Sequence, residues 1–286
     1  MAHFKITIAY DGAPFVGWQR QPSGPSIQGL LEDALATLDK QPVAVTGAGR
    51  TDAGVHALAQ VAAFELRRAD MDGPTIVRAL NAALPPTVRV LSACEVPPGF
   101  HPRFQARAKT YQYRIWNREV LLPFERGRVW HIPVPPLDVD AMARAALRLE
   151  GRHDFGAFQG TGVVTHTTER VVHRSCIGIV AAGPLHGSSR ETSEPQRSET
   201  QRREISDARI TRCDDEHPVI AYEIRGEGFL RHMVRNIVGT LVEIGRGRRP
   251  IEWLDDVLAS GDRTQAGRTA PADGLFLVRV EYDAQL

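Results

Sequence analysis

Apolar positions recur with a period of two in some stretches and at three- and four-residue spacing in others, which predicts alternating strands and helices. The clearest helix follows Ser26, a favourable N-cap residue, because apolar side chains recur on one face from Ile27 to Leu38. The predicted strands are 3–10, 43–45, 57–64, 88–96, 110–116, 170–181, 218–225 and 275–280, and the further predicted helices cover 74–84, 137–150, 230–244 and 251–259.

The order of these elements predicts an α+β fold. Strands outnumber the linkers long enough for helical crossovers, which favours mixed or mostly antiparallel sheets with helices on one face. We expect two similar α+β halves, residues 1–103 and 104–286. Residues 183–208 contain only three hydrophobic side chains and are interpreted as a polar insertion between two strands of a hairpin. An RNA-contacting role for the arginines of this insertion is the alternative.

Composition narrows the class of protein. With 286 residues, 42% hydrophobic and 24% charged, the chain is typical of a soluble globular protein and not of a fibrous or disordered one. Cys94, Cys176 and Cys213 form no local pair, which favours a reducing cytoplasm. No signal peptide is expected at the N-terminus, and no stretch approaches the 18 apolar residues of a membrane helix.

The densest chemical signal is the glycine-punctuated loop from Gly47 to His56, which is predicted to lie between two strands. Its glycines allow a ligand to approach the backbone closely. Asp52 stands beside Arg50 in this loop, and a neighbouring guanidinium favours an ionised carboxylate, as a nucleophile or a base requires. An Asx turn, in which Asp52 only bonds the loop backbone, is the structural alternative.

Other familiar site chemistries do not match. The loop lacks the lysine of a phosphate-binding P-loop, because Val55 follows Gly54. The ten histidines include no H-E-x-x-H motif and no His/Cys cluster at metal-ligand spacing, and no G-x-S-x-G motif occurs. The acidic run at 213–217 is interpreted as the solvated tip of a hairpin.

Charge is local rather than global. The 35 basic and 34 acidic residues nearly cancel, yet residues 99–132 carry seven basic and two acidic side chains, and 230–249 carry five and one. The basic residues of the first patch are Arg103, Arg107, Lys109, Arg114, Arg118, Arg126 and Arg128, and its aromatics are Tyr111, Tyr113 and Trp116. Such patches suit RNA phosphates and stacked bases, although an ordinary solvated arginine-rich face is an equal alternative.

Arg235 stands among apolar residues in the predicted helix over 230–244. A partly buried arginine needs a carboxylate partner, and Asp52 is the candidate whose loop most needs a cation. Tyr111 is open to three interpretations: a core residue, a platform for a base, or a weak acid or base in the site.

Several motifs, taken in order, resemble the TruA family of tRNA pseudouridine synthases over nearly the whole chain. They are Tyr10-Asp11-Gly12, Gly17-Trp18-Gln19-Arg20-Gln21, the loop from Gly49 to Ala57, Phe104-x-Ala106 with Tyr111-x-Tyr113, Met233 to Gly239, and Gly274 to Leu277. The resemblance implies two ferredoxin-like halves whose sheets join around a central cleft. It also implies isomerisation of uridine to pseudouridine at positions 38, 39 and 40 of the tRNA anticodon stem-loop, without cofactor or metal. The insertion at 183–208 is longer than the family's hairpin connection.

The resemblance also implies roles for single residues. Asp52 matches the catalytic nucleophile, Tyr111 the active-site tyrosine that stacks on the target base, and Arg235 the arginine paired with the aspartate. Arg50 is expected near the flipped nucleotide and Leu275 beneath the uracil. Five further residues are expected to bind the substrate: Gln19, Arg20, His56, Arg231 and His232.

The partner implied by the resemblance is tRNA, bound across a cytoplasmic homodimer. Two other functions use the same residues. A non-catalytic tRNA-binding or folding protein would bind RNA in a salt-dependent way without making product. A glycosidic-bond hydrolase would use Asp52 to release free uracil.

Overall fold

The computed structural model describes residues 1–283 except for 69, 163–164 and 184–217. The strands are β1 (Ala2–Tyr10), β2 (Thr46–Gly47), β3 (His56–Leu66), β4 (Val88–Glu95), β5 (Ala108–Trp116), β6 (Trp130–His131), β7 (Gly151–Asp154), β8 (Glu169–Ala181), β9 (Pro218–Gly226) and β10 (Leu275–Glu281). The helices are α1 (Ile27–Asp39), α2 (Gly73–Ala83), α3 (Val139–Leu147), α4 (Met233–Gly245) and α5 (Trp253–Ser260), with short 3-10 turns at Pro123–Glu125, Gly156–Phe158 and Arg263–Gln265.

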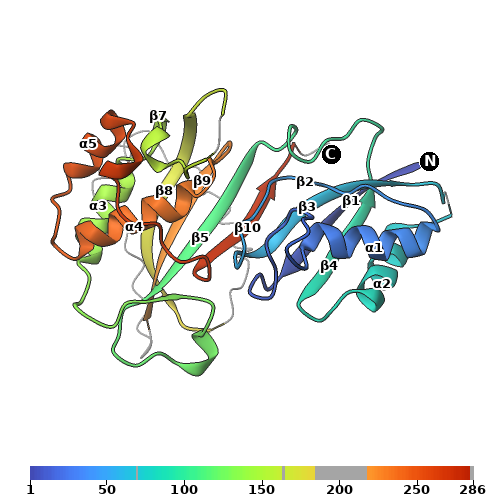
Figure 1. Ribbon diagram of the computed structural model, residues 1–286, viewed down its shortest axis with the longest axis horizontal. Helices are drawn as coiled ribbons and strands as arrows, with labels where there is room; N and C mark the ends of the chain where they lie inside the picture. Colours follow the sequence, from blue (N-terminus) through green and yellow to red (C-terminus); the bar gives the residue numbers. More distant parts are fainter. Residues whose placement is uncertain (69, 163–164, 184–217, 284–286) are drawn as a thin grey trace, which may run out of the picture.

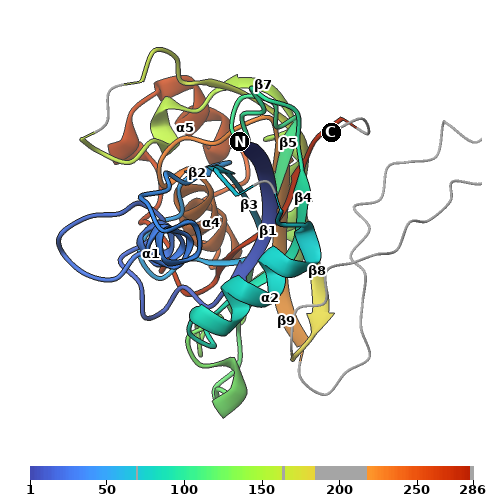
Figure 2. The same ribbon diagram turned by 90° about the vertical axis from the view of Figure 1, so that its right-hand side faces the viewer.

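The described strands form one continuous sheet in the order β4-β1-β3-β10-β5-β9-β8-β7, with β2 added to β3 and β6 to β5 (Figure 1). Most neighbours are antiparallel, and β10 pairs in parallel with β3. Helices α1, α4 and α5 lie on one side of this sheet (Figure 2). The predicted α+β class with a mostly antiparallel sheet is confirmed, while the division at residue 103 stays a prediction.

Local sequence explains where the helices begin and end. Ser26 accepts a hydrogen bond from the backbone N–H of Gly29 at 3.2 Å, so it caps α1 as predicted. Lys40 ends the same helix in the left-handed conformation, with φ at 56°. Asp72 caps α2 by accepting from the N–H of Thr75 at 2.8 Å. These caps satisfy N–H and C=O groups that a helix end leaves without partners.

One predicted strand is wrong. Residues 43–45 are irregular, and the short strand β2 begins only at Thr46. Val43 and Val45 are buried as an alternating pattern suggests, but Val45 bonds to side chains of α1: its N–H donates to Glu32 and its C=O accepts from Gln28. The prediction failed because burial of two valines does not require a neighbouring strand.

Other boundaries moved by a few residues. Helix α4 begins at Met233 rather than at Leu230, so Arg231 lies in the turn before the helix and not on its surface. Strands β6 and β7 were not predicted, because two and four residues are too few to show a period. The predicted insertion at 183–208, apart from Gly183, and the acidic run at 213–217 lie outside the described residues.

The buried faces of the strands and helices meet in one large core. Phe4, Ile6 and Ile8 alternate along β1 and are fully buried against Leu31 and Leu35 of α1. No helix among the described residues has the length and apolar character needed to cross a membrane.

Candidate active site

The loop between β2 and β3 is held by the segment that follows β1. The N–H of Trp18 donates to the C=O of Thr51 at 3.0 Å, and the hydroxyls of Tyr10 and Thr51 are 2.8 Å apart. A side chain at Gly12 would collide with the backbone C=O of Val55, at 2.0 Å, so the two segments touch through their backbones. The motifs around Tyr10 and Trp18 therefore serve as the support of the Asp52 loop.

The carboxylate of Asp52 points to a cation from the other half of the chain. Its Oδ2 atom accepts a hydrogen bond from Nη1 of Arg235 at 3.2 Å, and Nε2 of His232 lies 3.4 Å from the same oxygen. The Asp52 side chain is 29% exposed, so it is shielded yet reachable. This arrangement differs from an Asx turn, since among the described residues the carboxylate contacts side chains of the turn before α4 and of α4 itself.

Arg235 is fixed before any ligand arrives. It lies in the first turn of α4, its side chain is 16% exposed, and its Nε donates to the C=O of Ala270 at 2.7 Å. The guanidinium thus has one bond to the backbone and one to Asp52, which sets its plane. The pairing of Asp52 with Arg235, which the sequence could only suggest, is present.

His232 occupies an unusual backbone position, with φ at 61°. Burial lowers the pKa of its imidazole, and nearby Arg235 and Arg231 act in the same direction while Asp52 opposes them. A neutral imidazole keeps one N–H, which on Nε2 points to Asp52. Gly160 lies directly against the ring, since a Cβ there would be 2.7 Å from Nδ1.

Tyr111 lies on β5, and only 9% of it is exposed. Its ring packs edge-on against Phe229, with centroids 5.1 Å apart. Burial raises the pKa of its phenol well above the ordinary value, and the charge of Asp52 adds to this. The phenol is therefore protonated at neutral pH and can donate a hydrogen bond, whereas loss of its proton would form a strongly disfavoured phenolate.

The segment before β10 completes the surroundings of Asp52. Gly54, two residues after Asp52, packs on Ala272, whose Cβ would be 3.2 Å from a Cβ at Gly54. The N–H of Leu275 donates to the C=O of Ala272 at 2.9 Å, and Leu275 pairs with Tyr113 across the β10–β5 ladder. Leu275 is 6% exposed, so it contributes an apolar wall between the loop and β5.

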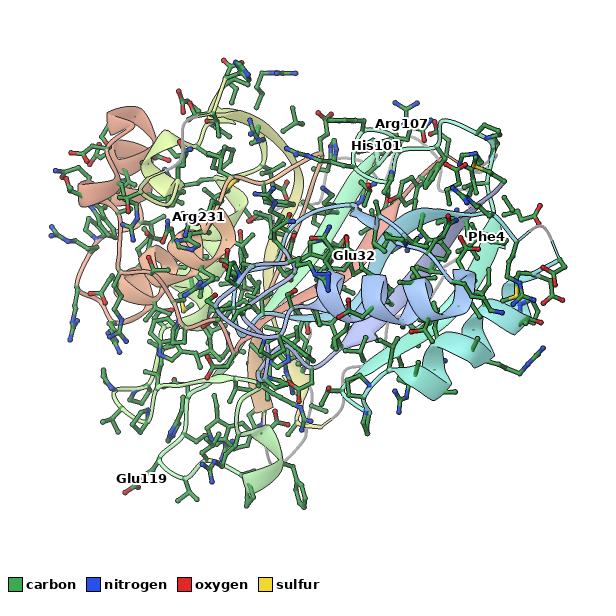
Figure 3. The ribbon with its side chains drawn as sticks, turned by 45° about the vertical axis from the view of Figure 1, so that its right-hand side comes forward. Phe4, Glu32, His101, Arg107, Glu119 and Arg231 are labelled. Atoms are coloured by element: carbon green, nitrogen blue, oxygen red, sulfur yellow. The ribbon has the colours of Figure 1, made fainter. Side chains whose placement is uncertain are left out.

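The other expected substrate residues are dispersed. Arg50 is exposed and has no carboxylate partner in the described part of the chain. Arg231 is exposed in the turn before α4 (Figure 3), and its C=O accepts from the N–H of Gly160. Arg20 pairs with Glu32 and Asp33 of α1, and Gln19 donates to Gln28 at 2.6 Å.

His56 lies in a different environment from the Asp52 group. It is 3% exposed and stacks on Phe276 with ring centroids 4.6 Å apart. Its Nδ1 accepts from the N–H of Gly12 at 3.1 Å, and its Nε2 lies 2.9 Å from the C=O of Gly127. Both nitrogens are thus engaged by the protein, which describes a structural link between β3 and the loop at Gly127.

The basic patch over 99–132 divides into buried and exposed parts. Tyr113 and Trp116 are fully buried and cannot stack on RNA, so that interpretation was wrong for these two aromatics. Arg114 is also buried, and it pairs with Glu125 at 3.2 Å. Alternation along β5 places Tyr111 and Tyr113 on one face. Of these two residues, Tyr111 is the one that lies near the Asp52 loop.

Three contributors were missed by sequence reasoning: Tyr10, which supports Thr51, Phe229, which supports Tyr111, and Gly160, which confines His232. Tyr10 lies within the Tyr10-Asp11-Gly12 motif, so the sequence does carry a signal for it. No local signal distinguishes Phe229 or Gly160, because each acts on a residue from a distant part of the chain.

Comparison with known proteins adds an independent finding. A family model described as tRNA pseudouridine synthase matches residues 6–105 and 181–283. The chain is 43% identical over 282 residues to the tRNA pseudouridine synthase A of Solibacter usitatus, covering 99% of this chain and 100% of the relative. Proteins of the same name from Myxococcus xanthus and Moorella thermoacetica are each 40% identical over 99% of this chain, and the match covers 92% and 100% of their lengths.

Proposed function

The chain belongs to the tRNA pseudouridine synthase family, an isomerase family that acts on tRNA, and we propose that it acts on uridines 38, 39 and 40 of the anticodon stem-loop, with Asp52 as the nucleophile. One observation carries the proposal for Asp52. Its half-buried carboxylate is paired at 3.2 Å with Arg235, which is 183 residues away in sequence. A fold that brings these two charges together in a shielded place holds an ionised carboxylate ready for reaction.

The chemistry balances without any added reagent. The bond between C1′ of the ribose and N1 of the uracil breaks, the base turns, and a bond forms between C1′ and C5. The proton on C5 leaves, and N1 of the product carries a proton. Substrate and product are isomers, so the protein must supply a nucleophile, a place for the base to turn and a path for one proton. Asp52 supplies the nucleophile by adding to the ribose or to the base.

Tyr111 and Leu275 fit the second requirement. An aromatic ring and a leucine side chain offer flat and apolar contact to a uracil that has left its stack. The raised pKa of Tyr111 opposes the loss of its proton, so the phenol acts as a hydrogen-bond donor. We assign Tyr111 the support of the base and, in its protonated form, the donation of a hydrogen bond to it.

Arg50 is suited to help unstack the target nucleotide. It is an exposed cation two residues before Asp52, in the loop that the target nucleotide must reach. Cationic and aromatic groups at such a position offset part of the cost of unstacking, which is a few kcal/mol. Arg231, exposed in the turn before α4 and next to His232 in sequence, has the same character.

Assembly and location form part of the proposal. The family resemblance supports a cytoplasmic homodimer with one tRNA lying across both subunits, and a chain of two domains, residues 1–103 and 104–286. The dimer is tested by sedimentation of the purified protein: a monomer at all concentrations that support activity would contradict it.

Tritium release from C5-labelled uridine in tRNA transcripts tests the reaction and the site together. Transcripts with one uridine at position 38, 39 or 40, and one without any of the three, report the position. The Asp52→Ala and Asp52→Asn variants should bind tRNA yet release no tritium. Asp70→Asn is the matched control, because Asp70 is an exposed aspartate that also pairs with an arginine, Arg68.

Each outcome points to one of the functions considered. Release by the wild type and by Asp70→Asn alone, from transcripts with a target uridine, supports the proposal. Release by Asp52→Ala would refute the role of Asp52. Binding without release by the wild type would indicate a non-catalytic RNA-binding protein, and free uracil among the products would indicate a hydrolase.

A further inference from the structure

Three cations take no part in the Asp52–Arg235 pair, and one of them, Lys109, bonds to the Asp52 loop. Lys109 lies on β5, Arg103 in the loop before β5, and Arg170 at the start of β8. Lys109 pairs with Gly226 of β9, which in turn pairs with Val172 of β8, two residues after Arg170, and the charge of Arg103 acts on both Lys109 and Arg170. We refer to Arg103, Lys109 and Arg170 as the cation cluster.

No carboxylate of the described residues lies within ion-pair distance of the cation cluster. The Nζ of Lys109 donates to the C=O of Ala48 at 2.7 Å, Arg170 donates to the C=O groups of Thr167 and Glu169, and Arg103 lies over the ring of Phe104. These partners are backbone oxygens and a ring, so the positive charges stay uncompensated.

Neighbouring arginines behave differently. Arg107 pairs with Asp283 at 2.7 Å and Arg225 pairs with Glu281 at 2.6 Å, close to the same ends of β5 and β9. The carboxylate of Glu169, next to Arg170 in sequence, lies 4.0 Å from Arg152 instead. The lack of a carboxylate is therefore not shared by every arginine of this region.

Burial and the charge of Arg103 lower the pKa values of the two other members of the cation cluster. Burial, followed by the charge of Arg103, lowers the pKa of Lys109 to about 8. The same two causes, in the same order, lower the pKa of Arg170. Lys109 and Arg170 are partly buried and Arg103 is exposed. Holding partly buried cations without a counter-ion costs stability, and such a cost is typical of a site that receives an anion from outside.

The position of the cluster relates it to the base site. Lys109 precedes Tyr111 by two residues on β5, so their side chains leave the same face of the strand about 7 Å apart. The residue opposite Lys109 on β9 is Gly226, and Gly228 lies against Arg170. Gly49 of the Asp52 loop borders Nζ of Lys109, since a Cβ there would be 3.3 Å away. Gly49 and Gly228 thus border two of the cations without side chains of their own.

We propose that Lys109, Arg103 and Arg170 bind one backbone phosphate of the RNA strand whose target base rests on Tyr111. The inference rests on the proposed function, because the RNA strand is placed by assuming that its target base rests on Tyr111. A phosphodiester brings one negative charge and several acceptor oxygens, which match an ammonium without a carboxylate partner and two guanidinium groups. Binding the base at Tyr111 and a phosphate one pleat along β5 fixes the nucleotide at both ends.

Removal of single charges on both partners tests the proposal. Anticodon stem-loop RNAs are made with one uncharged methylphosphonate at each successive position around the target uridine. Their binding is measured in an Asp52→Asn background, which keeps the cluster intact and blocks turnover. The variants are Lys109→Met, Arg103→Gln and Arg170→Gln, and the matched control is Arg107→Gln, a cation at the same end of β5 (Figure 3) that already pairs with Asp283.

With the cluster intact, methylphosphonate at one position should weaken binding about tenfold more than at its neighbours. The same RNA should lose nothing further when Lys109→Met or Arg170→Gln is present, whereas Arg107→Gln should leave the difference in place. The slope of log affinity against log salt should fall by about 0.7 for the Lys109→Met variant, as expected for one phosphate contact with a single strand.

The proposal would be overturned if the affinity losses from the cluster variants and from methylphosphonate multiplied at every position. An unchanged slope of log affinity against log salt would also overturn it. Thermal melting separates a folding effect from a binding effect: each cluster variant should melt no lower than the control. Tritium release by the wild-type protein on the unmodified RNA is measured in parallel. Failure of that reaction contradicts the proposed function, while failure of the charge-removal pattern contradicts only the phosphate site.

Discussion

Replacing Gly160 by alanine should reduce catalysis through His232 without touching the substrate. A Cβ at Gly160 would lie 2.7 Å from Nδ1 of His232, 3.0 Å from Cγ and 3.2 Å from Cβ. Ordinary contact begins at about 3.4 Å, so the ring must retreat by about 0.7 Å. The N–H of Gly160 donates to the C=O of Arg231 at 2.8 Å, which keeps the two backbones from moving apart.

The size of the effect follows from the contact that is lost. The Nε2 atom of His232 is 3.4 Å from Asp52, longer than the 2.7–2.9 Å of a strong charge-assisted hydrogen bond. A contact of this length is worth at most about 1.4 kcal/mol, which corresponds to about a tenfold slower chemical step. A misplacement approaching 1 Å can add to this, up to about a hundredfold.

Single-turnover rates of pseudouridine formation are the assay, because they report the chemical step apart from product release. Gly178→Ala is the matched control: Gly178 lies on β8 with no atom within 4 Å of an added Cβ. His232→Gly removes the ring and is compatible with the left-handed backbone at that position. In that background Gly160→Ala should slow the rate by less than about twofold.

Two results would refute the reasoning. Gly160→Ala could leave the single-turnover rate unchanged while His232→Gly lowers it, so that the displaced ring does not matter. Alternatively, the two losses could multiply in the double variant, which would show that Gly160 acts on something other than His232. An unfolded Gly160→Ala protein would be recognised by its melting curve and would contradict the view that only the imidazole moves.

Three further predictions concern stability. Burial lowers the pKa of His56, so the folded state resists its protonation, and stability is full above about pH 6.5 and falls as the pH drops below it. The His56→Gln variant should flatten that fall when urea unfolding is measured between about pH 5 and 8. An unchanged pH profile of stability would contradict this prediction. Arg114→Met should lower the free energy of unfolding by about 3–5 kcal/mol, because it leaves the buried carboxylate of Glu125 without its cation, and adding Glu125→Gln should recover part of the loss. The pKa of Lys109 falls from 10.5 to about 8 on folding, so the unfolded state binds more protons between these values and wild-type stability rises with pH there. The Lys109→Met variant should lack this rise and should be about 2 kcal/mol more stable than the wild type at pH 7. A less stable variant would indicate a purely structural lysine.

The fold was predictable wherever one face of an element is buried. Strand β1 and helix α1 follow their hydrophobic periods within a residue or two, because each packs a single apolar face on the core. The stretch 43–45 broke the rule, since its backbone bonds go to side chains of α1. Pairing of β10 between β3 and β5 was not predictable either, because strand order depends on contacts far apart in the sequence.

The candidate site was predictable in its parts but not in its geometry. Asp52 stood out by its glycine-rich loop, and Arg235 by being a cation among apolar residues, and both signals are local. That the two meet at 3.2 Å depends on how α4 sits above the sheet. The resemblance also suggested His56, whose neighbours in space, Phe276 and Gly127, show a structural link that no spacing along the chain could reveal.

The last strand explains why residues from both halves form one site. Strand β10 pairs in parallel with β3 and antiparallel with β5, so it fastens the strand that follows the Asp52 loop to the strand that carries Tyr111. The segment before β10 does the same for α4: the C=O of Ala270 accepts from Arg235, and the backbone at Arg268 fits against Gly239, where a Cβ would be 1.7 Å from its oxygen. Because Asp52, Tyr111 and Arg235 are each positioned by this one stretch, the geometry of the candidate site depends on the docking of β10 between β3 and β5. The candidate site is therefore coupled to the pairing of β10 rather than to either neighbouring strand alone.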